Sequence, residues 1–203
     1  MGSFPNSNVV VLEGAFPRGL SEAEFFELCQ ENPDLRMERE AHGEITIMSP
    51  VHTLSSYYES EVLRQLSNWH VQNGRKGLVL SSSGGITLPN GAVRSPDAAW
   101  ISPERAAQIS LEDRRRFAHV APDFVVELLS PSDALSRTQA KMEEYIAQGV
   151  RLGWLIHPDE GWVAIYRPGN PITYHRDFSR PLSAAPELPG FIFSLSEIGH
   201  PLI

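Results

Sequence analysis

One carboxylate interrupts an apolar run in the second half of the sequence. Residues Phe124 to Leu129 read Phe-Val-Val-Glu-Leu-Leu, which is typical of a β-strand covered on both faces. A carboxylate inside such a strand is costly unless it is paired, protonated or bound to a metal. Glu127 is therefore the first candidate for a functional residue, and a buried ion pair with an Arg or Lys is the structural alternative.

A second carboxylate precedes another apolar segment. Asp97 follows Pro96 and leads into Ala98 to Ile101. An Asp after a Pro is commonly a turn residue whose side chain caps nearby backbone, and that alternative stays open for Asp97 by itself. Together with Glu127 on a neighbouring strand, Asp97 can share a hard cation such as Mg²⁺, with a backbone carbonyl and waters completing the octahedron. The two carboxylates form a candidate metal site.

The third candidate is a lysine on the helix expected over 134–148. Lys141 is at helical spacing from Leu135, Thr138 and Tyr145, which places it on or beside the inward stripe of that helix. Its ammonium group can then reach the two carboxylates. The alternatives are a lysine extended along the surface and a counter-ion for Glu127 alone.

The elements that must position these residues follow from hydrophobic periodicity and from start and stop signals. Ser21 and Glu24 form a capping box for a helix that ends near Asn32-Pro33. The other predicted elements are a hairpin over Leu35 to Ser49 that turns at His42-Gly43, a helix over Thr53 to Asn73, strands at Leu78 to Ser81, Gly85 to Leu88, Val93 to Ile101 and Phe124 to Leu129, a helix over Ala134 to Gln148, and strands at Leu152 to Ile156 and Val163 to Tyr166. The order predicts an α/β or α+β fold with a mixed central sheet flanked by helices.

Length and composition indicate one globular unit. The 203 residues contain 41% hydrophobic and 21% charged residues, and no repeat or linker divides them. We expect a single domain over 1–203, with a motif core at about 35–168 and a C-terminal covering tail at about 169–203. Four apolar residues of that tail either cover the core or form a homodimer contact: Leu182, Leu188, Phe191 and Ile192.

Charge and hydropathy indicate where the chain resides and what it binds. No apolar run approaches the roughly 20 residues that span a bilayer. Met1 to Asn8 lack the charged region followed by an apolar region that begins a signal peptide. We therefore expect a cytoplasmic protein without membrane contact. A net charge of −8 disfavours non-specific nucleic-acid binding, although Arg114 to Arg116 or Arg75-Lys76 can form local basic patches. The single cysteine, Cys29, is expected to be a packed structural thiol.

Three ordered motifs carry a resemblance to a known family. They are Ser95-Pro96-Asp97-Ala98-Ala99-Trp100, Pro122-Asp123-Phe124-Val125-Val126-Glu127-Leu128-Leu129-Ser130-Pro131-Ser132, and Lys141-Met142-Glu143-Glu144-Tyr145 with Gly149-Val150. With their flanks, over about Leu20 to Pro168, they resemble the Uma family of restriction endonucleases within the PD-(D/E)XK nuclease superfamily. As a set these motifs are specific.

The resemblance implies a helix, three antiparallel-leaning strands, a second helix and a further strand, with cleavage of phosphodiester bonds, most often in DNA, that depends on Mg²⁺ or Mn²⁺. Asp97 and Glu127 match the metal-binding carboxylates. Leu129 stands where the usual pattern has its lysine, so Lys141 resembles a displaced catalytic lysine, accompanied by Tyr145.

Two positions near the motifs are left without an assigned role. His52 comes only two residues after Pro50, closer than the histidine of related sequences. Glu59, on the helix over Thr53 to Asn73, is expected to be a solvated surface glutamate, and the alternative is that it faces the site and joins the metal ligands. Two alternatives to a nuclease also stand: a non-catalytic binding module whose carboxylates and lysine form a buried ion network, and a metal hydrolase acting on a small phosphate ester.

Overall fold

The structure, a computed structural model, describes residues 9–11, 19–131 and 133–199. Residues 1–8, considered above for a signal peptide, and Ser132 of the second motif lie outside the described residues. The helices are α1 (Glu22–Glu31), α2 (Thr53–Gln72), α3 (Pro103–Ala106), α4 (Leu135–Ala147) and α5 (Ser196–Gly199), with a 3₁₀ turn at Asp113–Arg115. None of the helices in the described ranges is long and apolar enough to cross a membrane.

The strands form two six-stranded sheets and one two-stranded ribbon. The strands are β1 (Val9–Val11), β2 (Arg36–Arg39), β3 (Ile45–Met48), β4 (Leu78–Ser81), β5 (Ile86–Thr87), β6 (Val93–Arg94), β7 (Ala98–Ile101), β8 (Ala118–His119), β9 (Phe124–Leu128), β10 (Leu152–His157), β11 (Trp162–Tyr166), β12 (Thr173–His175), β13 (Leu182–Ser183) and β14 (Ile192–Phe193). The first sheet has the order β1-β3-β2-β6-β5-β8, the second β12-β11-β10-β9-β7-β4, and β13 pairs with β14.

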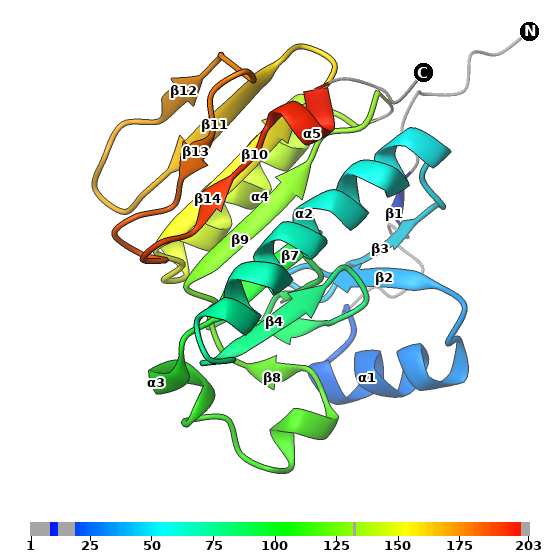
Figure 1. Cartoon of the computed structure of the whole chain (residues 1–203). Helices are drawn as coiled ribbons and strands as arrows, with labels where there is room; N and C mark the ends of the chain where they lie inside the picture. The colour runs from blue at the N-terminus through cyan, green and yellow to red at the C-terminus, as the bar shows by residue number, and fades with distance from the viewer. Residues whose placement is uncertain (1–8, 12–18, 132, 200–203) are drawn as a thin grey trace, which may run out of the picture.

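Helices cover both faces of the second sheet, so the expected mixed sheet flanked by helices is confirmed. Its strands β9 and β10 are parallel to each other. Strand β7 is antiparallel to both of its neighbours, β4 and β9. In Figure 1, α2 crosses one face and α4 lies behind the opposite face. Within the second sheet and its two covering helices, the elements from α2 to β10 follow one another as α2, β4, β7, β9, α4 and β10, which is the arrangement that the family resemblance implied.

Strand β9 sends alternate side chains into two different cores because successive residues of a strand point to opposite faces. Phe124 and Val126 pack with α2 and the C-terminal segment. Val125 packs on the other face with Met142 and Tyr145 of α4. Glu127 is two residues after Val125, so its side chain lies on the same face of the strand and points toward α4. This alternation is the local reason that a strand buried on both faces directs its one carboxylate toward one helix.

Most predicted elements are confirmed. Helix α1 begins with the capping box of Ser21 and Glu24, and its C-cap is Asn32. Strands β2 and β3 form the expected antiparallel hairpin, and Gly43 in its turn has a φ of 91°, which glycine adopts without strain. Helices α2 and α4 lie within one or two residues of their expected bounds.

The segment from Val93 to Ile101, expected as one strand, is divided in the structure. Val93 and Arg94 form β6 in the first sheet, whereas Ala98 to Ile101 form β7 in the second sheet. The intervening Ser95, Pro96 and Asp97 carry the chain from one sheet to the other. Proline has no N–H for a ladder, so a break at this position is physically reasonable. The division places Asp97 at the junction between the two sheets.

The segment after residue 168 contributes to the core. Strand β12 adds an edge to the second sheet by pairing with β11. Leu182, Leu188 and Phe191 are buried with α2 and β9, whereas the neighbouring Ile192 is 54% exposed. In Figure 1, β13, β14 and α5 lie on the same side of the sheet as α2. Of the four apolar residues, three therefore cover the core and Ile192 faces outward.

Candidate functional site

Strand register brings Asp97 and Glu127 together. Ala98 of β7 is opposite Val126 of β9 in an antiparallel pair. Asp97 comes one residue before Ala98 and Glu127 one residue after Val126, so the same register places the two carboxylates across from each other on one face. Side chains in such positions have Cβ atoms roughly 5 Å apart. Two residues that are 30 positions apart in the sequence thus become neighbours across two paired strands.

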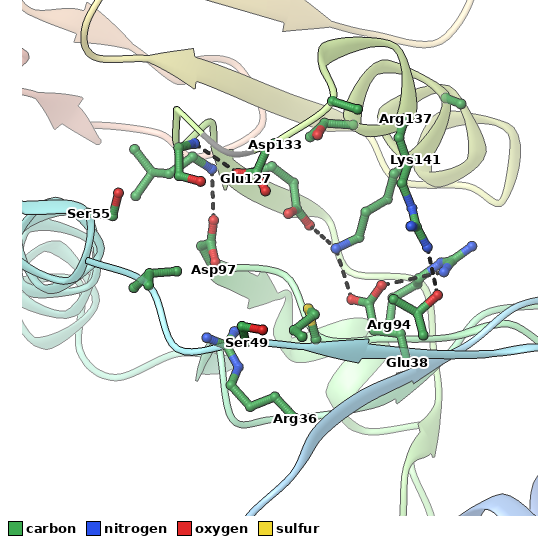
Figure 2. A pocket seen from close by; sticks show the side chains of 18 of the residues that line it. Arg36, Glu38, Ser49, Ser55, Arg94, Asp97, Glu127, Asp133, Arg137 and Lys141 are labelled. Atoms are coloured by element: carbon green, nitrogen blue, oxygen red, sulfur yellow. Dashed lines mark hydrogen bonds and ion pairs between the residues drawn. The ribbon is translucent and has the colours of Figure 1, made fainter. Parts of the chain in front are cut away.

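Lys141 reaches this pair from α4. Its Nζ lies 2.9 Å from Oε1 of Glu127 and 2.8 Å from Oε1 of Glu38, and Figure 2 shows the ammonium group between the two carboxylates. The Tyr145 hydroxyl, one helical turn later, donates a hydrogen bond of 3.0 Å to the same Glu127 oxygen. Close packing holds the helix here: a Cβ on Gly153 of β10 would lie 2.5 Å from Cε of Met142.

These side chains line a pocket of about 430 Å³ between β2 and β3 on one side and β9 and α4 on the other. The pocket combines carboxylates with cationic side chains. Its charged lining residues are Arg36, Glu38, Glu40, Glu59, Arg94, Asp97, Glu127, Asp133, Arg137, Lys141 and Glu144. Asp97, Glu127 and Lys141, the three residues singled out from the sequence, therefore share one concave site.

Backbone contacts fix Asp97 at the end of the sheet. Its Oδ2 accepts a hydrogen bond of 2.7 Å from the N–H of Leu128, the residue after Glu127. This bond joins the start of β7 to the end of β9. The bonded N–H is 31 positions away on the neighbouring strand, so this contact is a tertiary one and not the local turn cap of the alternative reading, and Asp97 faces the pocket.

The two carboxylates lie in an environment that disfavours their negative charge. Burial raises the pKa of Asp97 to about 7, and the nearby charge of Glu59 adds to the rise. Burial also raises the pKa of Glu127 to about 7; Lys141 opposes that rise, and Asp97 and Glu38 contribute to it. Desolvation and like charge are the two causes. Both carboxyl groups therefore hold a proton more readily than an ordinary Asp or Glu, with burial as the larger cause.

The donor set fits a hard divalent cation. Leu128 N–H occupies only Oδ2 of Asp97, and Lys141 and Tyr145 bind only Oε1 of Glu127. Among the described residues, none donates a hydrogen bond to Asp97 Oδ1 or to Glu127 Oε2. Nor do those residues include three or more His, Cys, Asp or Glu side chains grouped as a ligand set. Two carboxylates with open oxygens match Mg²⁺, which retains several waters.

Sequence reasoning missed Glu38 and Arg94. Both belong to the first sheet, both are buried, and they form an ion pair of 3.4 Å. Glu38 lies in the run Arg-Met-Glu-Arg, whose charges are typical of a solvated strand. For Arg94 the available signal was its position directly before Ser95-Pro96-Asp97, the motif that contains a candidate residue. Glu38 had no comparable local signal.

The structure also places the remaining sequence features, which are His52, Glu59, the two basic runs and Cys29. His52 is the N-cap of α2, where its Nδ1 accepts from the N–H of Ser55 at 3.3 Å. Glu59 lines the pocket. The basic runs Arg114 to Arg116 and Arg75-Lys76 are exposed and are not among the pocket-lining residues. Cys29 is partly buried, and burial raises the pKa of its thiol to about 11.

Comparison with known proteins identifies the family. A family model described as "Putative restriction endonuclease", Uma2, matches residues 22–196. The fold is similar to a crystal structure of a putative nuclease belonging to DUF820 from Anabaena variabilis ATCC 29413, with a TM-score of 0.71, 20% identity, 89% of this chain covered and 97% of that one. A search of curated proteins found no match. The family match spans all three motifs and the pocket, and the chain therefore belongs to the Uma2 family.

Proposed function

We propose that this protein is a metal-dependent endonuclease that hydrolyses phosphodiester bonds in DNA. Asp97 and Glu127 hold Mg²⁺ or Mn²⁺, and Lys141 is the catalytic lysine. The observation that carries the proposal is the meeting of these two cross-strand carboxylates with an ion-paired lysine in one pocket. Membership of the Uma2 family and the nuclease-like fold support it.

Each residue has a distinct part in the proposed reaction. The open oxygens of Asp97 and Glu127 bind the cation, which when present polarises the phosphate and makes water more acidic. Lys141 keeps its proton on Nζ: although burial opposes the charged form, Glu127 and Glu38 raise its pKa. A permanently protonated lysine stabilises negative charge that develops on phosphate oxygens. Tyr145 fixes the orientation of Glu127.

Cations at the pocket provide contacts for a polyanion despite the net charge of −8. Arg137 lies one turn before Lys141 on α4, its side chain is 42% exposed, and it donates a bond of 2.7 Å to Oγ1 of Thr46. Arg36 lies on the opposite wall, and its buried Nε has no hydrogen-bond partner among the described residues. Guanidinium groups bind phosphates through paired donors, so these two arginines are suited to the DNA backbone.

One observation favours a second candidate. Lys141 bridges Glu127 and Glu38, and Arg94 contacts Glu38, Glu40 and Glu144, so the site also forms a closed ion network. A non-catalytic binding module could retain such a network for stability alone. Calorimetry with Mg²⁺ separates the two candidates, because a purely structural network has no specific divalent-cation site.

The decisive experiment measures nicking of supercoiled plasmid DNA with Mg²⁺ or Mn²⁺. Asp97→Asn and Glu127→Gln are expected to abolish cleavage, while Glu187→Gln, which neutralises a partly buried carboxylate paired with Arg167 elsewhere, is expected to retain it. Circular dichroism confirms that each variant folds. Unchanged cleavage in both site variants contradicts the proposal. Parallel assays on RNA and on a nucleoside monophosphate test the choice of DNA.

A further inference from the structure

Glu38 is a buried carboxylate that contacts three separate segments of the chain. Only 4% of the residue is exposed. Its Oε1 accepts from Lys141 Nζ at 2.8 Å and from the Ser95 N–H at 2.8 Å, and its Oε2 lies 3.4 Å from Arg94. These partners belong to α4, to the junction before Asp97, and to β6. One side chain of β2 therefore connects both halves of the candidate site.

The position of Lys141 relative to Glu127 is not fixed by a shared backbone element. Glu127 is on strand β9, whereas Lys141 is on helix α4 and reaches the site through four rotatable methylene groups. With Glu127 as its only partner, the ammonium group is free to adopt several arrangements around that carboxylate. A second carboxylate on the opposite wall restricts Nζ to the line between the two, as Figure 2 shows. The ammonium group then leaves Oε2 of Glu127 open.

Glu38 is held in place independently of Lys141. Arg94 contacts Glu38, donates to Oε2 of Glu144 at 2.7 Å and also forms an ion pair with Glu40. Glu144 is three residues after Lys141 on α4, so Arg94 ties that helix to the first sheet. The Ser95 N–H gives Glu38 a further contact to fixed backbone. Glu38 is thus an anchor for the lysine and does not depend on it for its position.

We propose that Glu38 is a positioning residue that anchors Lys141 beside Glu127 and, through Ser95, fixes the chain leading into Asp97. In this role Glu38 acts through Lys141 and Ser95, and not directly on the substrate or the metal. The catalytic part of this inference rests on the proposed nuclease function. The anchoring part is a statement about Lys141 that can be measured without any substrate.

The sequence offers a direct test of anchoring because it contains only two lysines, Lys141 and Lys76. Lys76 is exposed and serves as the internal reference. An amine-acylating reagent is applied at one fixed pH, and peptide mass spectrometry gives the labelling rate of each lysine. In Glu38→Gln, the rate at Lys141 relative to Lys76 is expected to rise about tenfold, the effect of losing one hydrogen bond between charged groups.

Further variants separate loss of the contact from general loosening of the fold. Glu38→Asp keeps the charge beside Arg94 but is one methylene shorter, so it tests anchoring if Glu38→Gln fails to fold. Glu40→Gln removes another partner of Arg94 without touching Lys141, and its labelling ratio is expected to stay at the wild-type value. An unchanged Lys141 rate in both Glu38 variants, or an equal rise in Glu40→Gln, overturns the proposal.

Kinetics on plasmid DNA test the catalytic consequence. A misplaced Lys141 is expected to lower kcat roughly 10- to 100-fold, with KM changed less than about twofold because ground-state contacts with DNA remain. Glu187→Gln is the matched control for a partly buried carboxylate paired with an arginine. A rise in KM alone overturns the positioning role. If the wild-type protein cleaves no DNA while labelling still responds to Glu38→Gln, the proposed function fails and the anchoring of Lys141 stands.

Discussion

The Nζ atom of Lys141 lies 2.9 Å from Oε1 of Glu127, although one residue comes from α4 and the other from β9. Only 16% of the lysine side chain and 8% of the glutamate side chain are exposed. A pair at this depth cannot lose one member without leaving an uncompensated charge. The same contact therefore connects the stability of the fold with the chemistry of the pocket.

Lys141→Met is expected to destabilise the protein because Glu127 and Glu38 lose their shared cation. The free energy of unfolding should fall by about 3–5 kcal/mol, which corresponds to a fall in Tm of roughly 6–20 °C for a domain of this size. Calorimetry measures the change. Lys76→Met, at the exposed second lysine, should shift stability by less than about 0.5 kcal/mol. Equal shifts for the two lysines would argue against a buried ion pair.

Asp97→Asn is expected to remove cleavage while making the metal-free protein more stable at pH 8. At that pH Asp97 is ionised in a site that burial and Glu59 make unfavourable for charge. The neutral amide can still accept from the Leu128 N–H. We expect a gain of roughly 1–2 kcal/mol, less than the full pKa shift implies because water and relaxation reduce the penalty. Urea unfolding checks this, and a large loss of stability would contradict it.

Without divalent cations, Asp97 and Glu127 should lower stability as pH rises from about 4 to 7. Their folded pKa values, about 7, exceed the ordinary values of 3.8 and 4.5, so the folded state binds more protons across that range. Stability therefore falls as pH rises through it. The lowered pKa values of Glu38 and Glu40 act in the opposite direction, but below the ordinary glutamate value of 4.5.

Mg²⁺ should consequently stabilise the protein more at pH 8 than at pH 6. The cation requires deprotonated ligands, so protons compete with it at Asp97 and Glu127. The measurement is the rise in Tm on adding MgCl₂ at each pH. In Asp97→Asn the difference between the two pH values should shrink markedly. An equal rise at both pH values in the wild-type protein would count against these carboxylates as ligands.

Phe191→Ala should cost about 3–5 kcal/mol because the ring is buried against several aromatic side chains. Phe191 is 2% exposed and stacks on Trp154 with ring centroids 6.0 Å apart. Ile192→Ala is the matched control, since that neighbouring side chain is 54% exposed. The control should change stability by less than about 0.5 kcal/mol. Similar costs at the two positions would mean that the C-terminal segment is not part of the core.

Local sequence signals were sufficient for most elements and for the candidates themselves. The capping box of Ser21 and Glu24, the periodicity of α2 and α4 and the apolar run of β9 depend on residues close together in the chain. Glu127 was recognisable as a candidate because it interrupts an apolar run, and such a run indicates a strand buried on both faces even when the neighbouring strands are unknown. The residue pattern suggested Asp97 and Lys141 as its partners, the family resemblance added weight to both, and the structure places the three in one pocket.

Tertiary structure decided what depends on distant partners. The sequence did not reveal that the chain changes sheets between Arg94 and Asp97, nor that Phe191 packs beneath α2 while Ile192 faces outward. It also gave no sign of Glu38, because a charged residue among charged neighbours is ordinarily solvated. Its burial depends on cations that come 56 and 103 positions later, at Arg94 and Lys141. Local patterns determine which segments form helices and strands; the partners that make a buried charge tolerable are set only when the two sheets and α4 close around it.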